Sequence, residues 1–299
     1  MPNVSYSGKI ITNFGGSIVV KLINGKKINA TMRSNLKGEL TVGDNVELEH
    51  NNSTYVINKL LERKNLISRP NLYQRKNKNI AANIDQAVIV ITHAPSPVEH
   101  YIDRYLAALH NNNINPIIIV NKIDAQDEND KKHMNYLTDI YKSIGYEIFY
   151  ISAIKGIGMD KLLESLKGKT SIFLGQSGVG KSETLNTILG DEIISTKHIS
   201  ESTKKGRHTT TTSTLYEIDD KTNIIDSPGI REFGLCHITK EELFSGFRDF
   251  SKYNGQCQYR NCTHQENSKG CEIVNQVENG NIHPLRFKNY HRILVKISK

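Results

Sequence analysis

The sequence of 299 residues lacks any run of about 18 apolar residues, the length that crosses a bilayer as a helix. We therefore expect no membrane-spanning segment. The first residues, Met1 to Tyr6, also lack a basic segment followed by an apolar one, so we expect no secretion signal. The chain has only four cysteines, too few for a disulfide framework at this length. These absences favour a cytoplasmic protein.

Positive charge is in excess. The 39 Lys and Arg outnumber the 31 Asp and Glu, which gives a formal net charge of +8 and favours a polyanionic partner. Charge that serves only solubility is the alternative. A hydrophobic content of 37% is typical of globular domains, and the length suggests two or three of them.

The N-terminal part, to about residue 65, is predicted to form five short strands separated by turn signals such as Asn24-Gly25 and Gly43-Asp44. Five short strands in this length favour a small barrel of the OB-fold type. Such barrels often bind nucleic acid, and an inert spacer is the alternative. The predicted strands are Ser5–Thr12, Ser17–Leu22, Lys26–Met32, Asn45–Glu49 and Tyr55–Leu60.

Residues 62–70 are predicted to be a linker, followed by a basic loop at Arg75, Lys76 and Lys78. From Ile84 onward, apolar runs typical of buried strands alternate with segments of helical spacing. This alternation predicts a parallel α/β sheet, which binds ligands at the carboxyl ends of its strands. The predicted strands are 87–92, 116–120 and 147–151, and the predicted helices 98–110 and 130–144.

A phosphate-binding loop is predicted at Gly175–Ser182, between an apolar run and a helical segment. Successive backbone N–H groups there can point at one anion, and the helix N-terminus adds positive charge. Lys181 can reach the β- and γ-phosphates, and the Ser182 hydroxyl can ligate Mg²⁺. A Gly-rich turn that binds nothing is the alternative. The predicted residues are Gly175, Gln176, Ser177, Gly178, Val179, Gly180, Lys181 and Ser182.

Two further motifs follow predicted strands and can read a base. The Asp124 carboxylate can accept hydrogen bonds from N1–H and the 2-amino group of guanine. Adenine offers neither donor and would leave a buried carboxylate unpaired, which argues against an ATP-dependent enzyme. Asn121 can help to position the base, and the Lys122 stem can pack over its face. At Ser152-Ala153, a backbone N–H can meet guanine O6.

Residues 204–213 are polar and rich in hydroxyls, which predicts a mobile loop where a threonine, such as Thr210, ligates Mg²⁺ and senses the γ-phosphate. A plain Ser/Thr-rich surface loop is the alternative. After the next predicted strand, Asp226 can hold Mg²⁺ through water, and the Gly229 N–H can meet the γ-phosphate.

Three cysteines and a histidine cluster late in the chain, in a turn-rich polar stretch. Three thiolates and one imidazole can close a tetrahedral, structural Zn²⁺ site, and cysteines that are free by chance are the alternative. Cys236 stands apart and is interpreted as a packed thiol. The predicted metal ligands are Cys257, Cys262, His264 and Cys271.

Taken together, these motifs resemble the circularly permuted GTPases, because the base motifs precede the phosphate loop and the two switch segments. The N-terminal barrel, the loop Gly206-Arg-His-Thr-Thr-Thr211 and the Cys/His cluster resemble one family, the ribosome small-subunit-dependent GTPase A (RsgA). The resemblance covers essentially the whole chain. It implies an OB-like barrel over 1–66, a permuted P-loop GTPase domain over 67–235 and a mostly helical zinc domain over 236–299.

The resemblance also implies a Mg²⁺-dependent GTPase that binds GTP and GDP. It implies a monomer that binds the 30S ribosomal subunit and its 16S rRNA late in maturation and releases other assembly factors. Residues 283–299 predict a basic amphipathic helix, for which rRNA contact and packing on the metal site are both open. A nucleotide-gated RNA-binding module whose hydrolysis is incidental is the rival function.

Two positions depart from common patterns. Glu183 stands where the family usually has a small or hydroxyl residue, and a carboxylate near the α-phosphate can weaken nucleotide affinity unless it points outward. Ile230 stands where many GTPases place a Gln that orients the attacking water. His208, in the first switch loop, is the candidate for that role beside Lys181, and a solvent-exposed His is the alternative. The missing Gln predicts slow intrinsic turnover, with a partner that orders the site.

Overall fold

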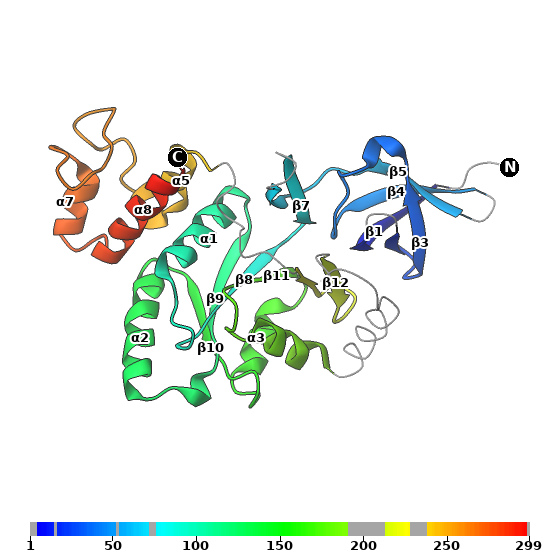
Figure 1. Cartoon of the computed structure of the whole chain (residues 1–299), viewed down its shortest axis with the longest axis horizontal. Helices are drawn as coiled ribbons and strands as arrows, with labels where there is room; N and C mark the ends of the chain where they lie inside the picture. The colour runs from blue at the N-terminus through cyan, green and yellow to red at the C-terminus, as the bar shows by residue number, and fades with distance from the viewer. Residues whose placement is uncertain are drawn as a thin grey trace.

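A computed structural model describes residues 5–14, 17–51, 54–71, 76–190, 213–227 and 238–297. It consists of a β-barrel, a sheet with helices on both faces and a C-terminal group of helices, with the barrel and the C-terminal helices at opposite ends (Figure 1). This arrangement confirms the three predicted parts. Within the described ranges, none of the helices combines the length and the apolar character needed to cross a membrane.

Five strands close the barrel in the order β1-β2-β3-β5-β4, and β4 pairs again with β1. Closure leaves little free strand edge, which is how small barrels avoid edge-to-edge association. Alternate residues of β2 are buried, including Ile18, Val20 and Leu22, as a pleated strand over one core requires. A 3₁₀ turn, Ser34–Leu36 (η1), follows β3. The strands are β1 (Ser5–Asn13), β2 (Ile18–Leu22), β3 (Lys27–Met32), β4 (Asn45–Asn51) and β5 (Thr54–Leu60).

The linker predicted at residues 62–70 was wrong for its second half. Leu66–Asn71 (β6) pairs antiparallel with Lys76–Ala82 (β7) in a separate hairpin. Ile67 and Ile80 are buried in the same core as one face of the α/β sheet, so apolar contacts fix the hairpin. The domain boundary at residue 66 stays a prediction and coincides with the start of β6, and the boundary at 235 lies outside the described residues.

The α/β sheet has the order β10-β9-β8-β11-β13-β12, in which the first five strands are parallel and β12 is antiparallel. All six residues of β8 are buried, because helices cover both faces of the sheet. The predicted strands are confirmed. The observed strands are β8 (Gln86–Ile91), β9 (Asn115–Val120), β10 (Glu147–Tyr150), β11 (Thr170–Leu174), β12 (Thr214–Glu217) and β13 (Asn223–Asp226).

Neighbouring residues of one strand belong to different cores, so the sheet separates two apolar layers. Ile89 packs in the core that contains Leu106 of α1 and Leu137 of α2, whereas Val90 packs in the core that contains Leu162 of α3. A capping box at Asp127 starts α2. The helices are α1 (Glu99–Asn111), α2 (Glu128–Ser143), α3 (Met159–Leu166) and a helix over 181–190.

The sheet continues into the barrel, because β12 pairs with β1 at Thr214 and Thr12. Glu217, at the end of β12, forms ion pairs with Lys21 of β2 and with Lys27 of β3, the latter at 3.0 Å. Burial alone would raise the pKa of Glu217, but the two lysines hold it below its usual value. These ion pairs therefore hold the barrel against β12, which belongs to the chain segment between the two predicted switch segments.

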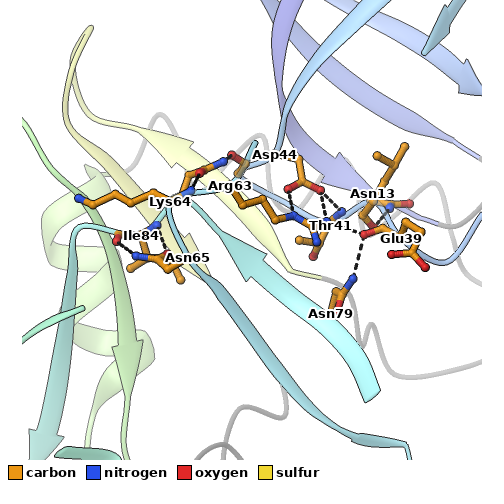
Figure 2. A network of polar contacts seen from close by, with 12 residues as sticks. Asn13, Glu39, Thr41, Asp44, Arg63, Lys64, Asn65, Asn79 and Ile84 are labelled. Carbon is orange, nitrogen blue, oxygen red and sulfur yellow. Dashed lines mark hydrogen bonds and ion pairs between the residues drawn. The ribbon is translucent and has the colours of Figure 1, made fainter. Parts of the chain in front are cut away.

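Polar side chains fix the joint between the barrel and the α/β sheet (Figure 2). Asp44 is fully buried and accepts hydrogen bonds from Arg63 Nε at 2.7 Å and Nη2 at 2.9 Å. Asn65 pairs with the backbone of Ile84 in both directions, at 2.7 and 2.8 Å. Rotation of the barrel would leave buried polar groups unpaired, so these contacts restrict its orientation.

Within the described residues 238–297, four helices form the C-terminal part, and their apolar residues share one core with Ala107 of α1. The last of them confirms the predicted basic amphipathic helix, with Phe287, Tyr290 and Ile293 buried and Arg292 and Lys296 exposed. The helices are α5 (Lys240–Gly246), α6 (Arg248–Ser251), α7 (Glu272–Glu278) and α8 (Pro284–Ile297).

One buried arginine joins α8 to the α/β domain. Arg286 is 1% exposed, donates to both carboxylate oxygens of Asp249 at 2.7 and 3.1 Å, and also contacts Asp103 of α1. Asp103 accepts further hydrogen bonds from Tyr141 at 2.8 Å and Asn289 at 2.7 Å. Loss of one partner from such a set costs about 3–5 kcal/mol, because a buried charge is left unpaired. The C-terminal helices are therefore fixed on α1 and α2.

Candidate functional site

The predicted base and phosphate motifs meet at one edge of the sheet. The strands β8, β9, β10 and β11 are parallel, so their carboxyl ends lie side by side. Asn121 follows β9 directly, Ser152 comes shortly after β10, and Gly175 follows β11. Motifs that are well separated along the chain thereby become neighbours in space.

The side chain of Asn121 joins these motifs. It is 1% exposed, and its Nδ2 donates to the carbonyl oxygen of Val179 in the phosphate loop at 3.1 Å. Its Oδ1 accepts a hydrogen bond from the backbone N–H of Ala153 at 3.2 Å. Gly180 has a φ of +90°, and a side chain at this position would collide with the Asn121 amide. Asn121 therefore sets the spacing between the base motifs and the phosphate loop.

Asp124 lies in a short 3₁₀ turn, Ile123–Ala125 (η2), after Lys122 in the left-handed backbone conformation. A hydrogen bond from the Ser152 side chain, with the nearby Lys155 and His93, holds the pKa of the Asp124 carboxyl below its usual value. The group is thus ionised at neutral pH and can accept two hydrogen bonds. The sequence predicted a buried carboxylate, whereas the structure exposes the Asp124 side chain. A bound base would therefore itself have to cover this carboxylate.

The phosphate loop has the backbone that its glycines permit, with positive φ at Gly175, Gly178 and Gly180. The Lys181 ammonium donates to the carbonyl oxygens of Gly175 at 2.7 Å and Gln176 at 2.6 Å. Lys122 donates in the same way to the carbonyl oxygen of Gly178, at 2.7 Å. Lys181 therefore holds carbonyl groups of the loop that phosphates of a nucleotide can replace as partners, whereas Lys122 links the base motif to the loop.

The other predicted loop residues differ in exposure. Val179 is 1% exposed and packs with Leu185 in the core that contains Leu162 of α3, which anchors the loop. Ser177 and Ser182 are exposed, as a hydroxyl that ligates an ion must be. Glu183 is also exposed, but its Oε2 lies 2.9 Å from the point where a Cβ on Gly180 would stand, so its charge faces the loop and can oppose a bound phosphate.

Of the predicted switch residues, the structure places only Asp226, which ends β13, the strand between β12 and the phosphate-loop strand β11. Its neighbour Ser227 pairs with Ser213 through their hydroxyls at 2.8 Å, so the end of the first switch segment lies beside the start of the second. His208, Thr210 and Gly229 lie outside the described residues, as does Cys236. Nucleotide binding by all these predicted residues stays a prediction.

Sequence reasoning missed the segment that follows β8. The Val98 N–H donates to Gln176 Oε1 at 3.4 Å, which brings this segment onto the phosphate loop. His93 Nε2 lies 3.8 Å from Asp130 Oδ2, and the charge of His93 contributes to the lowered pKa of Asp124. The sequence carried one signal for this segment. Because β8 is parallel to its neighbours β9 and β11, the residues that follow β8 must begin at the same edge of the sheet as the base and phosphate motifs.

The four predicted metal ligands come together in the C-terminal part. The ligand atoms of Cys257, Cys262, His264 and Cys271 all lie within 4.8 Å of one another, and His264 Nδ1 is 3.6 and 3.5 Å from the first and last sulfurs. The Phe244 ring stacks on His264 at 5.0 Å and fixes its orientation. Burial raises the pKa of the Cys271 thiol to about 12, and a bound cation opposes this because it stabilises the thiolate. The donor set fits a tetrahedral metal ion.

Comparison with known proteins agrees with this arrangement. A family model described as RsgA GTPase matches residues 60–236. A relative from Histophilus somni (strain 129Pt), named small ribosomal subunit biogenesis GTPase RsgA, is 40% identical over 297 residues, which is 98% of this chain and 84% of the relative.

Two solved structures are similar over nearly their whole length. YjeQ from Thermotoga maritima has a TM-score of 0.79 and 30% identity, and the match covers 98% of this chain and 99% of that one. YloQ, described as a circularly permuted GTPase, has a TM-score of 0.73 and 26% identity, with 99% and 96% covered. The predicted fold, a permuted GTPase domain between a barrel and a helical part with a Cys/His cluster, is confirmed.

The position of Asp124 predicts a change of base preference. Asp124→Asn should weaken GTP binding on the order of 10²-fold or more, because a guanine donor then faces an amide N–H₂. The same amide should improve binding of xanthosine triphosphate, whose 2-oxo group accepts from it. Titration with both nucleotides measures this. Asp127→Asn, which keeps a helix-capping side chain three residues on, is the matched control. Unchanged GTP affinity in Asp124→Asn would contradict the base assignment.

Proposed function

The chain belongs to the RsgA family of GTPases, and from this membership we propose that it hydrolyses GTP on the small ribosomal subunit during late maturation of that subunit. The observation that carries the proposal is the Asn121 side chain, which joins both base motifs to the phosphate loop in the permuted chain order. The relative named for small-subunit biogenesis supports the choice of particle.

The charge of the chain supports an RNA-rich partner. A net charge of +8 favours a polyanion, and exposed basic residues lie on α8, including Lys288, Arg292 and Lys296. The proposed partners are GTP and GDP, the 30S subunit with its 16S rRNA, and other small-subunit assembly factors. Ribosome assembly also favours a cytoplasmic location, and the protein is proposed to act as a monomer.

The nucleotide site is proposed to use this chain's groups as follows. Asp124 and Asn121 read and position guanine, and the Ala153 N–H meets its O6. Lys181 leaves the carbonyl groups of Gly175 and Gln176 for the β- and γ-phosphates. When bound, Mg²⁺ neutralises charge on these phosphates. The residues that would hold this ion are Ser182, Thr210 and, through water, Asp226.

Zinc is the metal proposed for the C-terminal cluster, because three thiolates and one imidazole are the donors of structural zinc sites.

Elemental analysis should find about one zinc per chain. Cys262→Ser should lose the metal and unfold mainly the C-terminal helices, because the free energy of metal binding there is free energy of folding. Hydrogen exchange resolves which helices open. Cys236→Ser changes the one cysteine outside the predicted ligand set; it is the control and should retain zinc. A metal-free protein with fully protected C-terminal helices would overturn the proposal.

His208 is proposed to orient the attacking water, because Ile230 cannot do so. His208→Ala should reduce stimulated turnover by roughly 10²-fold or more, the usual scale for a positioned acid–base group, with GTP affinity kept within a few-fold. Single-turnover hydrolysis and nucleotide titration separate the two effects. Equal losses of binding and turnover would instead make His208 a structural residue.

Small ribosomal subunits should stimulate GTP hydrolysis, because isolated protein lacks the Gln that orders the attacking water and a partner must order the site. GTP should reciprocally tighten subunit binding, and both effects should weaken steeply as salt rises. Hydrolysis is measured against small subunits, large subunits and bulk tRNA across a salt series. Equal stimulation by all three would reduce the ribosomal assignment to a general response to polyanions, and no stimulation would contradict it.

A further inference from the structure

A buried histidine lies between two cations where α1 meets α8. His100, in the first turn of α1, is 8% exposed. Its Nδ1 lies 3.5 Å from Arg292 Nη1, and its Nε2 lies 3.2 Å from Lys296 Nζ, both on α8. Helices that are far apart in the sequence thus place three nitrogen groups at one point.

These three groups supply only one acceptor to one another and need a further one. Guanidinium and ammonium groups only donate hydrogen bonds, whereas a neutral imidazole has one N–H and one acceptor nitrogen. Whichever tautomer His100 adopts, its single ring N–H faces the N–H groups of one cation, and its other nitrogen accepts from the second. An anion at this point would accept hydrogen bonds from both cations and from that ring N–H.

The surroundings add positive charge. Arg104 lies over the Tyr101 ring, at 4.6 Å from its centroid, and Lys296 Nζ lies 5.9 Å from the same ring. Burial, followed by the charges of Lys296, Arg292 and Arg104, lowers the pKa of His100 to about 4, so the imidazole is neutral at physiological pH. In the part of the chain that the structure describes, neither Arg292 nor Lys296 forms an ion pair with a carboxylate.

Another arginine of the same helix shows the contrast. Arg286 is buried and its charge is balanced by Asp103 and Asp249. Arg292 and Lys296, one to three turns further along α8, are exposed and are held against His100 instead. Their charge is therefore available to a ligand that arrives from solvent, and an arginine beside a lysine suits the non-bridging oxygens of a phosphate.

We propose that His100, Arg292 and Lys296 form a site for a backbone phosphate of RNA, hereafter the α1–α8 phosphate site. Arg292 and Lys296 donate to the phosphate oxygens, and His100 donates its ring N–H. RNA is the ligand class because the inference rests on the proposed function, in which the partner is a ribosomal particle. The site positions the particle and reads no sequence, since phosphate contacts carry none.

The test measures binding of the full chain, with a GTP analogue, to purified small ribosomal subunits over a salt series. Arg292→Gln/Lys296→Gln should weaken binding roughly tenfold and lower the slope of log affinity against log salt by about one, because the site neutralises one phosphate. His100→Leu should weaken binding a few-fold with an unchanged slope, because it removes a neutral donor. Lys132→Gln/Lys161→Gln removes the same charge from exposed positions of α2 and α3 and should leave the slope near wild type.

A wild-type slope in Arg292→Gln/Lys296→Gln would overturn the site, as would an equal fall in the control. GTP affinity, measured on each variant, reports that it is folded. If the wild type binds no small subunits, the proposed function fails, and the same series on a structured RNA decides the site separately. A slope that falls by about one there retains the α1–α8 phosphate site, and an unchanged slope or absence of binding overturns it too.

Discussion

Two hydrogen bonds of one buried amide organise the candidate site. Asn121 donates to Val179 in the phosphate loop and accepts from Ala153, so it spans three motifs that the chain presents far apart. This is possible only because β9, β10 and β11 are parallel and end at one edge of the sheet. The spatial arrangement of the motifs depends on the sheet and not on chain order, which is why a permuted sequence can assemble the same site.

The flanking parts are fixed to elements that carry this site. On one side, Lys21 and Lys27 of the barrel hold Glu217, at the end of the strand between the two switch segments. On the other side, Arg286 of α8 is buried against Asp103 of α1, the helix that follows the segment in contact with Gln176. Both flanking parts therefore contact the GTPase domain through charges, in addition to their chain connections.

Much of this could be predicted from the sequence. Apolar runs such as 116–120 and the motif at Gly175–Ser182 are local signals, and they predicted the strands, the loop and their shared edge. The hairpin of β6 and β7 was missed because its strands are mostly polar and each contributes few buried residues. Pairs such as Asp103 and Arg286, which are 183 residues apart, leave no local pattern. The contact of Val98 with Gln176 was missed for the same reason.

The most direct test of the account is a crystal structure of the protein with Mg²⁺ and a non-hydrolysable GTP analogue. The account predicts guanine on Asp124, with the Asn121 Nδ2 bond to the Val179 carbonyl retained and the Ala153 N–H moved from Asn121 Oδ1 to guanine O6. It predicts that Lys181 Nζ has left the carbonyl groups of Gly175 and Gln176 for the β- and γ-phosphates. A nucleotide whose base lies away from Asp124, or whose phosphates leave Lys181 on those carbonyl groups, would contradict the claim that Asn121 joins one guanine-nucleotide site.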